Sequence, residues 1–152
     1  MPARFRLPSA TMRLTPPERL RLVDSIADAE RGSAGEVRVH LEARCSNGDA
    51  LGRARQLFGE LGLQKTKEGT GVLLYVAELD RKTAVYAGPG IHAAVAATFW
   101  EGVTREVAAG FRRGAPLDGI TAAIHQIGET LRKHRPGPDV HANELPNEVS
   151  GT

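Results

Sequence analysis

The feature that most constrains the fold is a near-continuous apolar run, Val72–Ala77, bounded by Gly71 and by the polar segment 78–81. A run this short, with β-branched and aromatic residues, predicts a strand buried on both faces, as at the centre of a helix-covered sheet. A second β-prone run, Thr83–Tyr86, follows after only a few residues. The two runs therefore predict an antiparallel hairpin.

An earlier segment, Glu36–Glu42, alternates apolar Val37, Val39 and Leu41 with ionisable residues. This alternation predicts a strand with one buried and one polar face, near an edge of the sheet. Between it and Val72–Ala77 lies an apolar stripe at helical spacing. A strand–helix–strand crossover gives parallel strands and is right-handed, so the sheet is expected to be mostly parallel.

Apolar residues at helical spacing predict three more helices, which begin after Thr15, near Val95 and near Leu117. Thr15 and Glu18 have the spacing of a capping box. The segment 88–90 is expected to be a turn that closes the hairpin. The predicted fold class is α/β, a three-layer α/β/α sandwich with a mixed, mostly parallel sheet, one β-hairpin and about four helices.

Composition excludes several classes of function. The net charge is only +2 over 152 residues and aromatic residues are 5%, so the chain lacks the basic, aromatic surface of a nucleic-acid binder. Cys45 is the only cysteine, which excludes an internal disulfide and a cysteine-based zinc site, and we treat it as incidental. No apolar run approaches the ~20 residues that span a bilayer. We expect a cytoplasmic protein without a transmembrane segment.

Three regions are expected along the chain. Residues 1–13 form a flexible basic arm without the apolar core of a signal peptide. Residues 14–136 form the α/β domain. Residues 137–152 contain no lysine or arginine and few apolar residues, which predicts an extended tail. Met12 offers an alternative start to Met1.

Several segments carry family-level information when they are taken together and in order. They are Ser33–His40, Gly71–Ala77, Leu79–Lys82, Gly88–Ile91, Phe99-Trp100 and Asn143-Glu144-Leu145-Pro146. In this combination the chain resembles the TPM domain family, and within it a short bacterial subgroup without signal peptide or transmembrane segment. The resemblance covers about residues 13–150. Its signature positions are Glu36, Gly71, Asp80, Arg81, Gly88 and Gly90.

The resemblance implies a three-layer α/β/α fold and several activities. Some members are described as acid phosphatases, some bind calcium, and others are membrane-associated or assembly factors. This chain has His92 where many relatives carry a glutamate after the Gly-x-Gly turn, and Pro89 where the subgroup often has aspartate. Each change removes a carboxylate, which weakens the expectation of ion-dependent chemistry at this turn.

The acidic residues Asp49, Glu78 and Asp80 form the candidate metal site. Ligands of open α/β sheets bind beyond the carboxyl ends of parallel strands, where these three residues are expected. Carboxylates with loop carbonyls suit a weakly bound divalent cation such as calcium. The alternative, which we favour, is that Asp80 and Arg81 shape the hairpin turn while Asp49 caps a helix. No cofactor is required.

Two further groups have alternative interpretations. Gly88 and Gly90 are suited to present backbone N–H groups to an anion, or more simply to form a turn with positive φ. Glu36 either faces a cleft or is a strand residue paired with a base. The histidines lack the spacing of a metal site, and positive charge near His134 suits a helix C-terminus.

Two hypotheses for the function follow. The first is a protein-interaction or assembly/stress-related module with an unidentified protein partner, a membrane-associated partner being one option. The alternative, from the resemblance, is a divalent-metal-dependent acid phosphatase-like hydrolase with a carboxylate site at the C-terminal end of the sheet. We favour the first because no nucleophile–base pair is visible in the sequence, and no catalytic residue is assigned.

Overall fold

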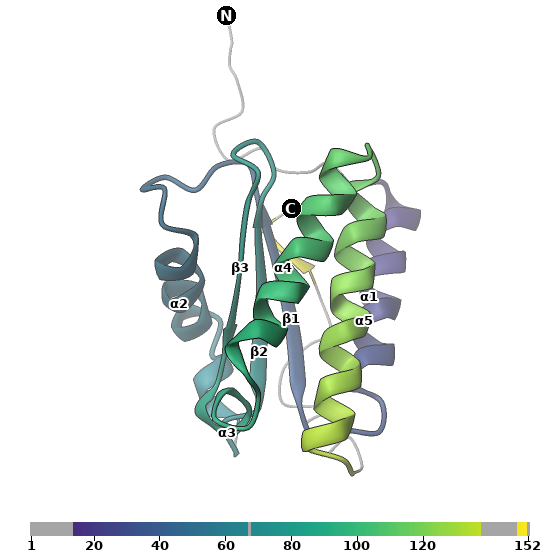
Figure 1. Ribbon diagram of the computed structural model, residues 1–152. Helices are drawn as coiled ribbons and strands as arrows, with labels where there is room; N and C mark the ends of the chain where they lie inside the picture. Colours follow the sequence, from purple (N-terminus) through teal and green to yellow (C-terminus); the bar gives the residue numbers. More distant parts are fainter. Residues whose placement is uncertain (1–13, 67, 138–148, 152) are drawn as a thin grey trace, which may run out of the picture.

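The computed structural model describes residues 14–66, 68–137 and 149–151. A four-stranded sheet lies between two helical layers (Figure 1). Its strands are β1 (Glu36–Glu42), β2 (Gly71–Ala77), β3 (Lys82–Ala87) and β4 (Val149–Ser150), in the order β3-β2-β1-β4. The helices are α1 (Pro16–Glu30), α2 (Ala50–Glu60), α3 (Pro89–His92), α4 (Ala97–Arg112) and α5 (Pro116–His134), with a 3-10 turn η1 (Leu63–Lys65) after α2.

The hairpin and the crossover predicted from the sequence are confirmed. β2 pairs antiparallel with β3, and it pairs parallel with β1 from Glu36↔Gly71 to Glu42↔Ala77. Every residue of β2 is buried. Helix α2 covers one face of the sheet, while α1, α4 and α5 cover the other (Figure 1). The α/β/α sandwich with a mostly parallel sheet is therefore the observed fold.

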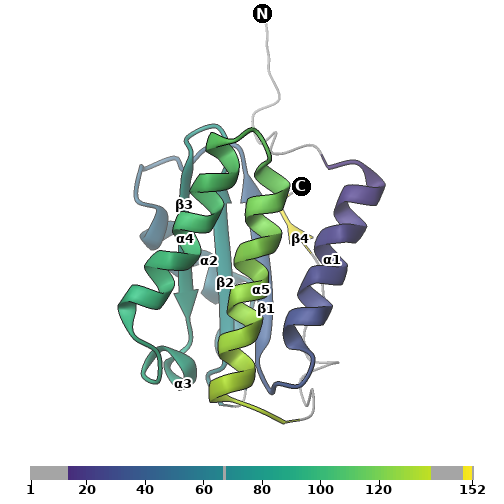
Figure 2. The same cartoon turned by 45° about the vertical axis from the view of Figure 1, so that its right-hand side comes forward.

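β1 lies next to an edge strand of the sheet, as expected, but its ionisable face is buried. β4 pairs with β1 on the side away from β2, through Val39↔Val149 and His40↔Ser150 (Figure 2). All residues of β1 except Glu42 are buried, and Arg38 is only 6% exposed. The ionisable side chains of β1 thus form a buried row. Val149 and Ser150, which the sequence placed in an extended tail, belong to the sheet, whereas residues 1–13 and 138–148 lie outside the described residues.

Helix ends follow local sequence chemistry with two differences. Thr15 and Glu18 form the predicted capping box of α1, and the Asp49 side chain accepts from Gly52 N at the start of α2. The expected turn after β3 is instead the one-turn helix α3, with Pro89 in its first turn, so the described residues form five α-helices rather than about four. Val95 precedes α4 rather than lying in it.

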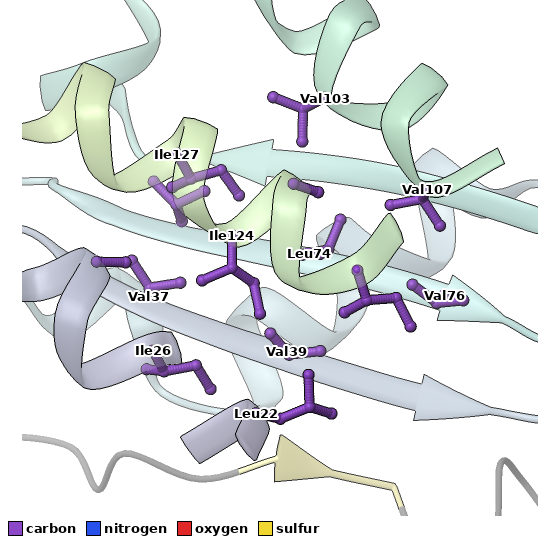
Figure 3. Close-up of a cluster of buried hydrophobic side chains, with 14 of the residues drawn as sticks. Leu22, Ile26, Val37, Val39, Leu74, Val76, Val103, Val107, Ile124 and Ile127 are labelled. Atoms are coloured by element: carbon purple, nitrogen blue, oxygen red, sulfur yellow. The ribbon is translucent and has the colours of Figure 1, made fainter. Parts of the chain in front are cut away.

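The sheet separates two apolar clusters because successive side chains of a strand point to opposite faces. On the side of α1, α4 and α5 the larger cluster gathers residues from these three helices, from α3 and from all four strands; Figure 3 shows part of it. On the side of α2, Leu73 and Tyr75 pack with Ala54 and Phe58. Among the described residues, no helix has the length and apolar character needed to cross a bilayer.

The signature glycines Gly88 and Gly90 are required by close packing. Neither has a positive φ, so the expectation of a left-handed turn at this site is wrong. A Cβ on Gly90 would lie 1.8 Å from the carbonyl oxygen of Glu68, and one on Gly88 would lie 2.5 Å from that of Gly69. Gly90 N also donates to the Gly69 carbonyl at 2.8 Å. Because of these contacts, α3 packs directly against the backbone of the loop that precedes β2.

We expect Gly90→Ala to lower the free energy of unfolding by about 1–3 kcal/mol, because the added methyl group meets rigid backbone. Gly59→Ala in α2 is the matched control, since a Cβ there meets nothing within 4 Å. That control should leave stability unchanged or raise it by up to about 1 kcal/mol, as alanine favours helix. Urea denaturation measures both; equal stability of the two variants would contradict the close packing.

Candidate functional site at the carboxyl end of the sheet

Four segments meet at the carboxyl ends of β1 and β2. They are the loop from β1 to α2, the hairpin tip between β2 and β3, the turn between α4 and α5, and the start of α1, all at the upper end of Figure 1. Backbone pairing continues past the strands, as Glu78 N donates to Glu42 O and Leu79 N to Ala43 O, both at 2.8 Å. The hairpin tip is therefore fixed to the loop that follows β1.

Asp80 stabilises this junction. Its carboxylate accepts from Arg44 Nη1 at 2.8 Å and from the backbone N–H of Cys45 at 2.7 Å. Both carboxylate oxygens thus have a partner from the β1–α2 loop. This geometry gives Asp80 a structural contact across two loops, rather than only the local turn role expected from the sequence.

The other two predicted metal ligands lie in different surroundings. Asp49 caps α2 through Gly52 N at 3.0 Å, as the sequence alternative proposed. Glu78 lines a separate hollow that also contains Arg21, Leu117 and Asp118. Among the described residues, no three His, Cys, Asp or Glu side chains are grouped to hold a metal ion. Asp49, Glu78 and Asp80 therefore have different neighbours in this structure.

A polar network around Glu42 is the feature that sequence reasoning missed. Arg53 of α2 binds both carboxylate oxygens, through Nε and Nη2 at 3.0 Å each. The Tyr75 hydroxyl from β2 donates to Oε2 at 2.5 Å, and His40 Nε2 lies 3.3 Å from Oε1. The Glu42 side chain is only 17% exposed. A bidentate arginine and a phenol thus enclose one carboxylate.

The network holds Glu42 in its charged form. Burial would raise the pKa of Glu42, but the hydrogen bonds from Arg53, Tyr75 and His40 outweigh it and lower the pKa from 4.5 to about 2. Burial, with the neighbouring Glu42 charge, raises the pKa of Tyr75. Burial lowers the pKa of His40 although Glu42 opposes this effect. The stable arrangement at neutral pH is therefore carboxylate, phenol and neutral imidazole.

His40 connects this network to β4. Its Nδ1 lies 2.9 Å from the Ser150 hydroxyl. Since Glu42 is ionised and accepts from Nε2–H, Nδ1 is the acceptor and Ser150 the donor. A hydroxyl, an imidazole and a carboxylate in this order can activate a serine, and they also join two strands by hydrogen bonds. Ser150 Oγ additionally lies 3.4 Å from the Val39 carbonyl.

The remaining signature residues have structural surroundings. Glu36 is 2% exposed and lies within the sheet, so it does not face an open cleft. Gly71 begins β2, where a Cβ would lie 3.1 Å from the Leu63 carbonyl. Arg81 has φ of 55°, the only positive φ of a non-glycine residue in the described part of the chain. Cys45 is buried beside Tyr75 in the cluster under α2.

Comparison with known proteins assigns the chain to a family. A TPM domain profile matches residues 10–130, and the chain belongs to the TPM domain family. The chain is 36% identical to the BA42 protein of the psychrophilic bacterium Bizionia argentinensis. The match covers 90% of this chain and 94% of that one, with a TM-score of 0.80. No match was found among curated proteins.

Two more distant structures share the fold. The N-terminal domain of a P. gingivalis protein is 17% identical, with a TM-score of 0.67 and 82% of each chain covered. The N-terminal domain of cg2496 from Corynebacterium glutamicum is 10% identical, with a TM-score of 0.61 and 86% and 82% covered. The family resemblance drawn from the sequence is confirmed.

The Glu42 network predicts a defined acid sensitivity. A carboxyl group whose pKa falls from 4.5 to about 2 on folding stabilises the protein fully above pH 4.5 and loses this contribution as the pH falls towards 2. The contribution is about 3 kcal/mol. Wild type should therefore exceed Glu42→Gln in stability at pH 6, and the gap should close by pH 2.

Urea denaturation across pH 2–6 measures this gap. Glu60→Gln is the control, because Glu60 is exposed on the same helix as Arg53. It should differ little from wild type at every pH. A gap between wild type and Glu42→Gln that stays constant with pH would show that Glu42 is not held charged by its partners.

Proposed function

We propose that this TPM domain is a cytoplasmic binding module that recognises a protein partner through the carboxyl end of its sheet. The observation that carries the proposal is the internal pairing of the acids there. Asp80 is bound by Arg44 and the Cys45 amide, Glu42 by Arg53, and Asp49 by the start of α2. The acids thus serve the scaffold, which favours a binding surface over a metal-assisted reaction.

Exposed residues at the same end supply groups for a partner. Leu79 at the hairpin tip is 54% exposed, and it sits between the paired Asp80 and the fixed β1–α2 loop. Arg81, Lys82 and Arg112 are also exposed. An exposed apolar side chain with exposed cationic groups at the same end of the sheet resembles the centre and rim of a protein interface.

The test is affinity purification from the native cell, followed by titration of the purified partner with the purified domain. Leu79→Asp should weaken that binding by about tenfold or more, because it places a charge at the expected centre of the interface. Ala93→Asp is the matched control, since Ala93 is exposed but follows α3 at the opposite end of the sheet. Failure to recover a partner, or equal binding by both variants, would overturn the proposal.

One observation favours hydrolysis as the second candidate function. The Ser150 hydroxyl contacts the His40 imidazole, which in turn contacts the Glu42 carboxylate, and this arrangement can activate a serine as a nucleophile. A hydrolase that used this serine would not need the carboxylate metal site expected from the resemblance. A weakly bound divalent cation such as calcium, at the hairpin tip, belongs to the same candidate. It would have to displace the Arg44 guanidinium from Asp80.

We expect no turnover of an aryl phosphate or aryl ester above a buffer blank, with or without calcium, magnesium or manganese, at acid and neutral pH. The reason is that the Glu42 charge and its partners also have a structural role in joining β1, β2 and α2. Turnover that survives repurification and disappears in Ser150→Ala would favour the serine. Turnover that disappears instead in Asp80→Asn would favour the metal. Either result would overturn the ranking.

A further inference from the structure

A cationic pocket lies between the start of β3 and the last turns of α4. It has a volume of about 190 Å³. Arg81, Lys82 and Arg112 stand around it, and Val107 and Phe111 contribute its apolar wall. The volume suits one small anionic group carried by a short apolar stem, such as an acidic side chain.

The three cations of this pocket are not neutralised by the protein. None of them forms a salt bridge with any residue in the described ranges. Asp80, the acid adjacent to Arg81, is bound on the other side by Arg44 at 2.8 Å. Unpaired cations around a shared hollow attract an anion more strongly than isolated surface charges do. The pocket is therefore complementary to a carboxylate or phosphate.

Arg81 is held towards the pocket at a conformational cost. Its φ of 55° lies in the left-handed region, which glycine occupies without penalty and other residues avoid. Its guanidinium lies 5.2 Å from the centroid of the Phe111 ring. A hairpin turn at this position would form more easily with glycine, so turn formation alone does not explain the arginine. Its placement over Phe111 puts a planar cation at the mouth of the pocket.

The edge of the sheet runs from this pocket along β3. Gly88 N donates to Gly71 O at 2.8 Å, so these two residues form a hydrogen-bonded pair. In an antiparallel ladder, hydrogen-bonded and non-hydrogen-bonded pairs alternate from one residue to the next. The backbone groups of Lys82, Ala84 and Tyr86 therefore face β2. Those of Thr83 and Val85 face outward, where β3 has no neighbouring strand among the described residues.

We propose that the β3 edge and the cationic pocket together bind an extended, acidic segment of a partner protein. The segment would add a strand to β3 through the backbone groups of Thr83 and Val85, as in β-strand addition, and an acidic side chain would enter the pocket. The pocket alone would suit an anionic lipid headgroup, but a membrane offers no backbone for the strand edge. This inference rests on the proposed function and names the chemistry of its partner.

The test uses capped octapeptides in which glutamate and valine alternate. Binding is followed by fluorescence anisotropy and by amide shifts of the ¹⁵N-labelled domain. Saturable binding should shift Thr83 and Val85 and should weaken as salt rises, because the pocket contact is ionic. A peptide with lysine for glutamate should not bind. A peptide with proline for alternate valines, which lacks the pairing N–H groups, should bind at least about fivefold more weakly.

Variants of the domain make the test specific. Arg112→Glu and Lys82→Glu should each weaken peptide binding by at least about fivefold. Lys65→Glu is the charge-matched control, since Lys65 lies in η1 at the opposite end of the sheet, and it should bind as wild type does (Figure 1). Arg81→Gly should weaken binding while leaving the melting temperature at or above that of wild type, because glycine relieves the left-handed conformation.

Three outcomes would overturn the inference. The first is that no peptide binds, and the second is that the lysine peptide binds as tightly as the glutamate peptide. The third is that the domain binds anionic phosphatidylglycerol vesicles but no peptide, and that Arg112→Glu weakens the vesicle binding. The last outcome would assign the pocket to lipid. If the peptides fail while a partner from the native cell still binds and depends on Leu79, only this inference falls and the proposed function stands.

Discussion

The parallel pairing of β1 with β2 is the constraint on which the other elements depend. The two strands match over their full lengths, from Glu36↔Gly71 to Glu42↔Ala77. Parallel strands cannot be joined by a tight turn, so the chain must return across one face of the sheet, and α2 occupies that face. The other face requires its own helices. Because β1 ends in an enclosed carboxylate, the same pair of strands also determines which residues bind it: Arg53 from the crossover helix neutralises its charge, and Tyr75 from the neighbouring strand donates a hydrogen bond.

The elements predicted correctly are those with local causes. The apolar run of β2, the short distance to β3 and the cap at Thr15 each fix structure within a few residues. The burial of β1 could not be predicted in the same way. An alternating pattern indicates a polar face open to water, unless partners for the polar side chains come from elsewhere. Here Arg53 comes from the next helix and Ser150 from a strand far along the chain. α3 and β4 are too short to leave a periodic pattern.

The difference between local and long-range contacts also explains which parts of the candidate site could be predicted. Asp49 could be placed because a cap acts three residues away, whereas the contact of Asp80 with Arg44 crosses from one loop to another. Glu42 was overlooked because a strand-end acid has no motif. One signal was available: a tyrosine in a fully buried strand needs a partner for its hydroxyl. Tyr75 and Glu42 lie near the carboxyl ends of strands predicted to be neighbours, which would have suggested the pair.

β4 is synthesised long after β1, the strand with which it pairs. Ser150 lies 110 residues beyond His40. At about 5–20 residues per second, synthesis leaves β1 without its second neighbour for roughly 5–20 s. An open, apolar strand edge in a nascent chain invites pairing with other unfinished chains, and charged side chains oppose it. The ionisable residues that alternate along β1 are of the kind that opposes such pairing, and their final partners include Ser150, one of the last residues to be made.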